Sequence, residues 1–99
     1  MEFKTQKDGT GLTIDLIGEL NTVTAPELSA LLDKELPGVE TLTLNFKECE
    51  YISSAGLRVL LATHKSMKAS GGVMQLTDVG EVFLDVLENT GLDGVFKIV

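Results

Sequence analysis

Residues 51–61 read YISSAGLRVLL, and they place two serines between an apolar run that ends at Ile52 and a second apolar run that begins at Leu57. Serine is among the residues preferred at the N-cap of a helix, where its side-chain oxygen accepts a hydrogen bond from a free backbone N–H. The stretch therefore predicts a change from strand or loop to helix near Ser54. Only one residue can be the N-cap, so either Ser53 or Ser54 is left over for another role.

Both sides of this stretch carry periodic apolar patterns. Before it, TLTLNF alternates apolar and polar residues, which predicts a strand over residues 42–46. After it, helical spacing continues until Ser-Gly-Gly at 70–72 closes the helix, and a short strand follows over 73–77. The expected apolar side of this helix consists of Leu57, Leu60, Leu61, His64 and Met67. The helix would link two parallel strands by a right-handed crossover, and partners usually bind where such a strand ends and its helix begins, which is where the serines lie.

The chain before this unit predicts a hairpin followed by a helix. MEFKTQK alternates, the turn DGTG follows, and LTIDLIG alternates again, which is typical of two antiparallel strands. Thr22 or Thr24 is expected to cap the helix, with Pro26 in its first turn, where the missing N–H costs nothing. Pro-Gly at 37–38 ends the helix. Its apolar positions are Leu28, Leu31, Leu32 and Leu36.

The last part of the chain predicts a third helix and a short apolar segment. GEVFLDVLENTG places Phe83, Val86 and Leu87 inward and Gly91 at the C′ position, and GVFKIV is either an edge strand or a packed tail. Strands that alternate with helices after an opening hairpin imply an α/β sandwich, with a mixed β-sheet of about four to five strands and three helices mainly on one face. At 99 residues and 43% apolar content, residues 1–99 fit one compact domain.

Composition narrows the classes of function. Eight basic residues against fifteen acidic ones give a formal charge of −7, which repels nucleic-acid phosphates and anionic lipid but attracts a basic patch on a protein. No apolar stretch approaches the roughly 18 residues of a membrane span, and charges stand where a signal peptide has its apolar core. We therefore expect a cytoplasmic protein that binds neither nucleic acid nor membrane. Cys49 is the only cysteine and His64 the only histidine, so we expect no disulfide, metal or cofactor and a buried or half-buried Cys49.

An enzymatic role for the serines lacks a base. ISSAG differs from the G-x-S-x-G pattern of a nucleophile elbow, because Ile52 replaces the first glycine. His64 lies roughly 15 Å beyond Ser54 along the predicted helix, at about 1.5 Å per residue, and Lys65 and Lys68 are similarly distant. The stretch also lacks the glycine-rich patterns that cradle nucleotide phosphates. No catalytic residue is expected.

Gly56 is a second unusual feature of the stretch. A glycine inside a helix costs about 0.8 to 1.0 kcal/mol relative to alanine. Two explanations account for it: a partner that approaches the backbone closely, or neighbouring chain that packs against it. The sequence leaves both explanations open.

Two segments resemble the marked segments of a known family. YISSAGLRVLL, after the strand TLTLNF, resembles the signature of bacterial anti-sigma factor antagonists, which are single STAS domains. Their motif contains an aspartate, a serine, a serine or threonine, and then glycine and leucine. LIGELNTVTAPEL (residues 16–28) resembles the family's other segment, in which Gly-Glu-Leu precedes an aspartate and the first helix. The resemblance extends over nearly the whole chain and implies a STAS-like sandwich fold.

The resemblance also implies a phosphorylation switch. In that family, the first serine after the motif's aspartate accepts phosphate from the anti-sigma factor, which is itself a serine kinase. The matching position is Ser54, with Ser53 as the second choice. The unphosphorylated antagonist binds the anti-sigma factor and frees a sigma factor; phosphorylation releases the antagonist, and a PP2C-type phosphatase restores it. The resemblance places partner binding at Glu19, Asn21, Thr22, Ser53, Ser54, Ala55, Gly56, Leu57 and Arg58.

Three positions depart from the family pattern. Ser53 replaces the motif's aspartate, Ala55 replaces its second hydroxyl residue, and Asn21 replaces the aspartate after Gly-Glu-Leu. Ser53 and Asn21 keep the capacity for hydrogen bonds but not the charge. An alternative function therefore stays open: a STAS module that is never phosphorylated and serves as a scaffold or subunit of a larger signalling assembly.

Overall fold

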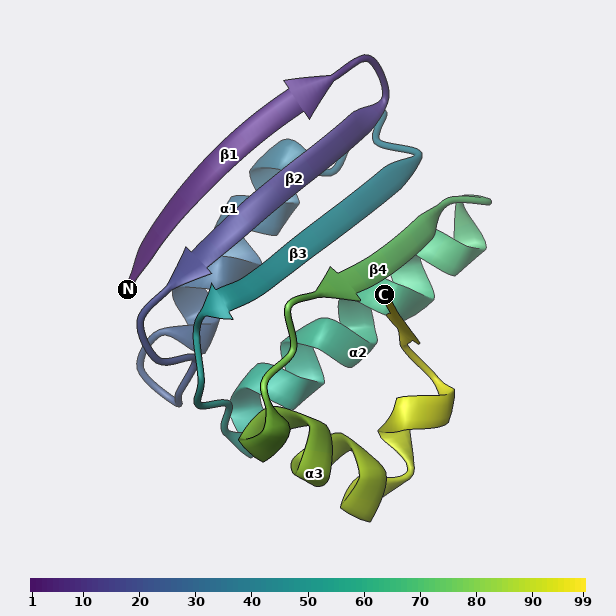
Figure 1. The fold of residues 1–99 in the computed structure, drawn as a ribbon. Helices are drawn as coiled ribbons and strands as arrows, with labels where there is room; N and C mark the ends of the chain where they lie inside the picture. Colours follow the sequence, from purple (N-terminus) through teal and green to yellow (C-terminus); the bar gives the residue numbers. More distant parts are fainter.

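The computed structural model describes residues 1–99 and contains one five-stranded sheet (Figure 1). The strands stand side by side in chain order; β1 is antiparallel to β2, and every later neighbouring pair is parallel. The elements are β1 (Glu2–Asp8), β2 (Gly11–Ile17), α1 (Ala25–Glu35), β3 (Thr41–Glu48), α2 (Ser54–Ala69), β4 (Val73–Thr77), α3 (Glu81–Thr90), a 3-10 turn (Leu92–Gly94) and β5 (Lys97–Ile98). The predicted mixed sheet with three helices is confirmed.

The opening hairpin forms as the alternating pattern predicts. β1 pairs with β2 along its whole length, from Glu2 opposite Ile17 to Asp8 opposite Gly11. Gly9 lies in the turn with a positive φ of 62°, which residues with a side chain rarely adopt. The hairpin supplies the antiparallel edge of the sheet, and β2 then begins its parallel part.

The core lies between the sheet and the helices α1 and α2, which cover its far face in Figure 1. Alternate residues of the inner strands point to that side, as the period of two requires. They are almost completely buried and comprise Leu12, Ile14, Leu16, Leu42, Leu44, Phe46, Met74 and Leu76. From α1, Leu28 and Leu32 are buried against them, while Leu31 and Leu36 are half-buried at the margin.

The buried stripe of α2 differs from the predicted one. Its buried residues are Gly56, Leu60, Thr63 and Met67. Three members of the predicted side are only half-buried: Leu57, Leu61 and His64. Thr63 can be buried because its hydroxyl donates a hydrogen bond to the carbonyl oxygen of Val59 at 2.7 Å, which satisfies the polar group. None of the helices, including this longest one, combines the length and apolar character needed to cross a membrane.

α3 lies at the lower end of the molecule in Figure 1, close to where β3 and β4 end. The ring of Phe83 meets the ring of Phe46 edge to face, with centroids 4.8 Å apart and planes at 80°. Leu87 is buried one turn later, and Gly91 ends the helix in the left-handed conformation with φ of 77°. The Phe46–Phe83 contact therefore joins α3 to the sheet.

The final segment combines both predicted alternatives. Phe96 is buried, as expected of a packed tail, and its ring meets the half-buried His64 ring edge-on at a centroid distance of 5.8 Å. Lys97–Ile98 then adds β5, which pairs with only Gln75 and Leu76 of β4. The last strand is thus short, and the tail is held mainly by Phe96.

The contact between α3 and the sheet is tested by replacing Phe83 with alanine. We expect Phe83→Ala to lower the free energy of unfolding by about 3–5 kcal/mol, because it removes a buried ring and leaves a cavity. The neighbouring Val82 is 65% exposed, so Val82→Ala should change stability by less than about 0.5 kcal/mol. Urea unfolding of both variants measures the difference, and equal losses would contradict the assigned packing.

Candidate functional site

Two loops meet at the carboxyl edge of the parallel strands. Residues 18–24 follow β2 and lead into α1, while residues 49–53 follow β3 and lead into α2. An isolated parallel bridge joins Leu20 to Ile52, in which the Leu20 N–H donates to the Tyr51 carbonyl at 3.0 Å and the Ser53 N–H donates to the Leu20 carbonyl at 2.8 Å. The bridge brings the starts of two helices together, and with them the two segments that resemble the family's motifs.

Ser53 is the N-cap of α2. Its backbone is extended (φ −94°, ψ 172°), and its Oγ accepts a hydrogen bond from the Gly56 N–H at 3.3 Å. This is the geometry expected of a capping serine, and it leaves Ser53 half-buried with its oxygen engaged.

Ser54 is the serine left over. It occupies the first position of α2, its side chain is exposed, and its hydroxyl makes no hydrogen bond within the chain. The N-terminus of a helix carries a partial positive charge. Ser54 therefore presents a free hydroxyl to solvent at a point that favours an anion.

Thr24, one of the two threonines predicted to cap this helix, is the N-cap residue of α1, but its side chain makes no capping hydrogen bond to the helix. The Asn21 Oδ1 accepts from the N–H groups of Val23 and Thr24 at 2.9 and 3.0 Å, and the Thr24 Oγ accepts in return from the Asn21 N–H at 2.8 Å. This is a reciprocal capping box. Thr24 itself has helical angles (φ −89°, ψ −20°) and makes no side-chain cap, while Thr22 is exposed. Asn21 therefore caps the turn that precedes α1, and Thr24 ends that turn at the N-cap position.

Gly56 is explained by packing within the chain. A Cβ at this position would lie 2.8 Å from Cγ of Leu20 and 2.9 Å from Cγ1 of Ile52. Gly56 is also buried, so a partner does not reach its backbone directly. Of the two explanations from the sequence, the structure supports close packing: the glycine lets α2 begin directly against the bridge between the loops.

The other residues expected at the partner surface differ in exposure. Glu19 and Arg58 are exposed, whereas Ala55 and Leu57 are half-buried. Arg58 lines the groove between α1 and α2 together with Asp33. The surface that a partner can touch directly is thus formed mainly by Glu19, Thr22, Ser54 and Arg58.

Two exposed apolar residues in these loops were not expected from the sequence. Val23 is 77% exposed beside the Asn21 cap, and Tyr51 is 49% exposed before Ile52. A periodic pattern of apolar residues predicts which side of a strand or helix is buried. Val23 and Tyr51 lie in loops, where no such pattern applies.

Cys49 is buried beneath the loops. Its side chain is 1% exposed, and its Sγ lies 3.5 Å from the carbonyl oxygen of Tyr51. Burial raises the pKa of the Cys49 thiol above its ordinary value, and hydrogen bonds with the backbone of Leu20 and Tyr51 oppose the rise only in part. The thiol therefore stays protonated near neutral pH and is a poor nucleophile, in keeping with the predicted burial.

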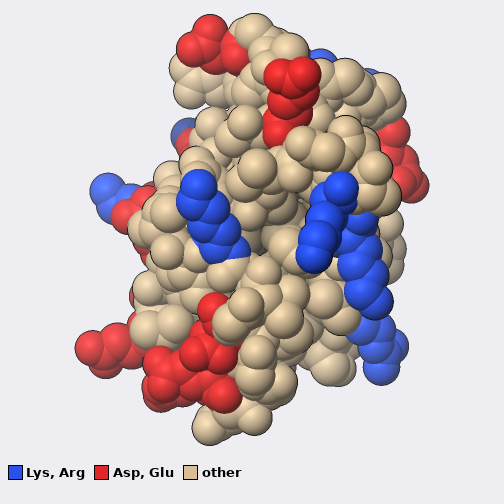
Figure 2. All heavy atoms as spheres, turned by 90° about the vertical axis from the view of Figure 1, so that its right-hand side faces the viewer, with Lys and Arg blue, Asp and Glu red and all other residues tan.

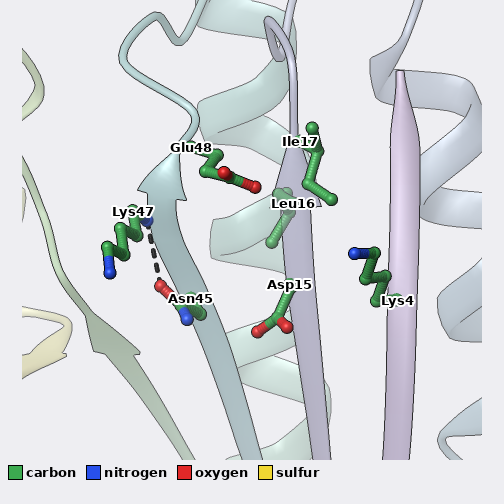
Figure 3. Close-up of a pocket in the computed structure, with 7 residues that line it drawn as sticks. All are labelled: Lys4, Asp15, Leu16, Ile17, Asn45, Lys47 and Glu48. Carbon is green, nitrogen blue, oxygen red and sulfur yellow. Dashed lines mark hydrogen bonds between the residues drawn. The ribbon is translucent and has the colours of Figure 1, made fainter.

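A shallow hollow on the uncovered face of the sheet offers no comparable site (Figure 3). Lys4 of β1 and Asp15 of β2 occupy paired positions there, and the Lys47 N–H donates to Oδ1 of Asn45 at 2.9 Å. The ammonium of Lys4 and the carboxylate of Asp15 are not within ion-pair distance, since the one ion pair of the structure joins Lys7 to Glu35. No reactive group converges on this hollow, so the loop edge is the better candidate.

The family model described as STAS domain matches residues 2–99. The chain belongs to the STAS domain family. The sequence motifs and the order of strands and helices thus agree with the family assignment.

Proteins similar to this chain include anti-sigma factor antagonists. The anti-sigma-B factor antagonist of Bacillus subtilis (strain 168) is 29% identical over 90 residues, which cover 88% of this chain and 80% of the relative. The Thermotoga maritima protein TM1081 has a crystal structure with a TM-score of 0.91 and 28% identity over 97% of this chain and 84% of that one. The anti-sigma factor antagonist SpoIIAA in its unphosphorylated form has a TM-score of 0.75 at 20% identity, over 95% of this chain and 97% of that one, a likeness of fold alone. The resemblance drawn from the two motifs is confirmed.

The packing role of Gly56 in this STAS chain is tested by adding one methyl group. Gly56→Ala should lower the free energy of unfolding by about 1–3 kcal/mol through overpacking, despite the gain of about 0.8 to 1.0 kcal/mol in helix propensity. Gly94→Ala is the matched control, since no atom lies within 4 Å of its Cβ position. The urea concentration at the unfolding midpoint measures the stability of both variants, provided that the dependence of the free energy of unfolding on urea concentration is unchanged. A stabilised Gly56→Ala variant would show that the glycine is not required by packing.

Proposed function

We propose that this STAS domain, residues 1–99, is an anti-sigma factor antagonist. In its unphosphorylated form it binds an anti-sigma factor serine kinase in the cytoplasm and so releases a sigma factor. Phosphate on Ser54 ends that binding, and a PP2C-type phosphatase restores it. The domain itself supplies a binding surface and an acceptor hydroxyl and performs no catalysis.

The free hydroxyl of Ser54 is the observation that carries the proposal. Ser54 is exposed and has no hydrogen-bond partner, whereas the oxygen of Ser53 is half-buried and accepts from the Gly56 N–H. A kinase that holds ATP needs an acceptor oxygen that can approach the γ-phosphate in line with the leaving group. Ser54 meets that requirement better than Ser53, so it is the proposed acceptor.

The consequences of phosphorylation follow from charge and position. The Ser54 oxygen would bond to the γ-phosphorus of ATP, ADP would leave, and the hydroxyl proton would pass to a base of the kinase. The phosphate adds about −1.5 to −2 charge at a helix N-terminus, where the helix dipole favours an anion, so the fold should tolerate it. Its effect falls on the interface, because a surface shaped to a hydroxyl would have to strip water from a dianion.

Asn21 and Ser53 replace aspartates of the family motifs, and both still act as helix-capping or turn-capping residues, a role that aspartate can also perform. Asn21 and Ser53 each accept a backbone N–H at the start of a helix. Aspartate, asparagine and serine rank together as N-cap residues. With Asn21 and Ser53 in place of the aspartates, both loops can therefore keep their shape. The two negative charges are lost, but the capping hydrogen bonds remain.

The comparisons support the proposed class of partner. The relative from Bacillus subtilis is named for antagonism of an anti-sigma-B factor. The Bacillus protein SpoIIAA has also been solved in a phosphorylated form, whose structure resembles this one with a TM-score of 0.78. The phosphorylated form has kept the same fold, which is in line with the expected tolerance of phosphate.

A second candidate function is a STAS scaffold that is never phosphorylated. The observation that favours it is the missing charge at Ser53 and Asn21, since a kinase that reads carboxylates at those positions would not recognise this chain. The two candidates differ in whether partner binding responds to charge at residue 54.

Charge at residue 54 separates the two candidates. We expect Ser54→Asp to weaken binding of a purified anti-sigma factor kinase at least tenfold, a loss of about 1.4 kcal/mol, and Ser54→Ala to bind within about twofold of the wild type. Ser66→Asp, at an exposed position nearer the other end of α2, is the control and should bind like the wild type. Isothermal titration calorimetry measures all four proteins. A Ser54→Asp variant that binds as tightly as the wild type would favour the scaffold.

A further inference from the structure

A hollow of about 570 Å³ lies beside the Ser54 loop, between the end of β3 and the start of α3. We call it the α3 hollow, and it is lined by Gly18, Glu19, Lys47, Glu48, Glu50, Tyr51 and Val82. Of these residues, only Glu19 belongs to the surface expected from the sequence. The connection from β4 to α3 brings the first turn of α3 to the same edge of the sheet as the two motif loops.

Two apolar side chains that line the α3 hollow are exposed to solvent: Val82 from the first turn of α3 and Tyr51 from the loop after β3. Val82 is 65% exposed, while the next residue, Phe83, is 1% exposed against the core. Tyr51 is 49% exposed from the facing loop. Large apolar side chains exposed together in a concave place are typical of surfaces that another protein covers.

The polar part of the α3 hollow has one dominant sign of charge. Glu19, Glu48 and Glu50 place three carboxylates around it, against the single ammonium of Lys47. None of these groups forms an ion pair, because the only ion pair of the structure is elsewhere. Figure 2 shows acidic side chains at the upper and the lower end of the molecule and basic ones across the middle.

We propose that the α3 hollow is a second contact region for the anti-sigma factor and receives an arginine side chain of that partner, flanked by aliphatic residues. This inference rests on the proposed function. The aliphatic stem of an arginine would pack against Val82 and its guanidinium would lie over the Tyr51 ring. The same guanidinium would reach the surrounding carboxylates with charge-assisted hydrogen bonds. Arginine fits better than lysine, since its flat, weakly hydrated group both stacks and bridges carboxylates.

The α3 hollow and Ser54 belong to one continuous surface. Tyr51 lies three residues before Ser54 in the same loop, and its carbonyl oxygen accepts from the Leu20 N–H in the bridge that holds the site together. Glu19 lies directly before Leu20 in the other loop. A partner seated on Ser54 therefore lies next to the hollow, and the interface extends from α2 to the first turn of α3.

The test compares two variants of the hollow with two matched variants elsewhere. Val82→Asp and Glu50→Lys change the apolar and the acidic part of the hollow, while Val99→Asp and Asp8→Lys make the same kinds of change at exposed residues outside it. Binding of the purified anti-sigma factor kinase is measured by calorimetry at about 0.05 and 0.5 M salt. The distance over which charges interact before salt screens them differs several-fold between the two conditions. Urea unfolding of each variant checks that it is folded.

We expect Val82→Asp and Glu50→Lys each to weaken binding at least tenfold at low salt, and the loss from Glu50→Lys to shrink at high salt, because it is electrostatic. Val99→Asp and Asp8→Lys should stay within about twofold of the wild type. If Ser54→Asp abolishes binding while both hollow variants bind like the wild type, the hollow is not part of the interface and the proposed function stands. If the wild type itself binds no anti-sigma factor, both proposals are overturned.

Discussion

The bridge between Leu20 and Ile52 is the contact on which the candidate site depends. It consists of one short parallel pairing beyond the ends of β2 and β3, with the Leu20 N–H and carbonyl both engaged by the facing loop. Both residues are buried, so the pairing is also an apolar contact. Gly56 packs directly on the two side chains, and its lack of a Cβ sets how closely α2 approaches them. Two helices thus begin side by side because two loops are held together beneath them.

The hydroxyl of Ser54 is free although several polar groups near this bridge are engaged. The polar groups around it have local partners: Asn21 caps the turn before α1, Thr24 returns a hydrogen bond to Asn21, and Ser53 caps α2. Buried or half-buried polar groups that are satisfied in this way stiffen a loop. Ser54 follows the last cap and points outward without a partner. A frame of this kind, which holds the unengaged hydroxyl of Ser54 in one position, suits an acceptor that another protein must find.

Much of the fold could be predicted from the sequence, and the exceptions have physical reasons. Periods of two and of three to four located the first four strands and the three α-helices, since both arise from burial of one side, whereas the final segment was left as either an edge strand or a packed tail. The same reasoning omitted Thr63, whose polarity is hidden by a hydrogen bond within its own helix. It also did not predict that Asn21, rather than the N-cap residue Thr24, supplies the capping side chain before α1. It also missed Val23, Tyr51 and Val82, since apolar residues exposed in loops or first turns follow no period. At the site, the cap rule predicted that one of the two serines caps α2 but left open which one, and the structure assigns the cap to Ser53. The reason for Gly56 required knowing that Leu20 and Ile52 face it.

The central claim is that Ser54 is the acceptor of a phosphate that switches partner binding. The most direct measurement is incubation of the purified chain with its anti-sigma factor kinase and ATP, followed by peptide mass mapping of the phosphorylated residue. A single phosphate at Ser54, absent from the Ser54→Ala variant and present in Ser53→Ala, is the predicted result. Phosphate at neither serine, with the kinase active on itself or on another substrate, would contradict it and leave the domain as a scaffold.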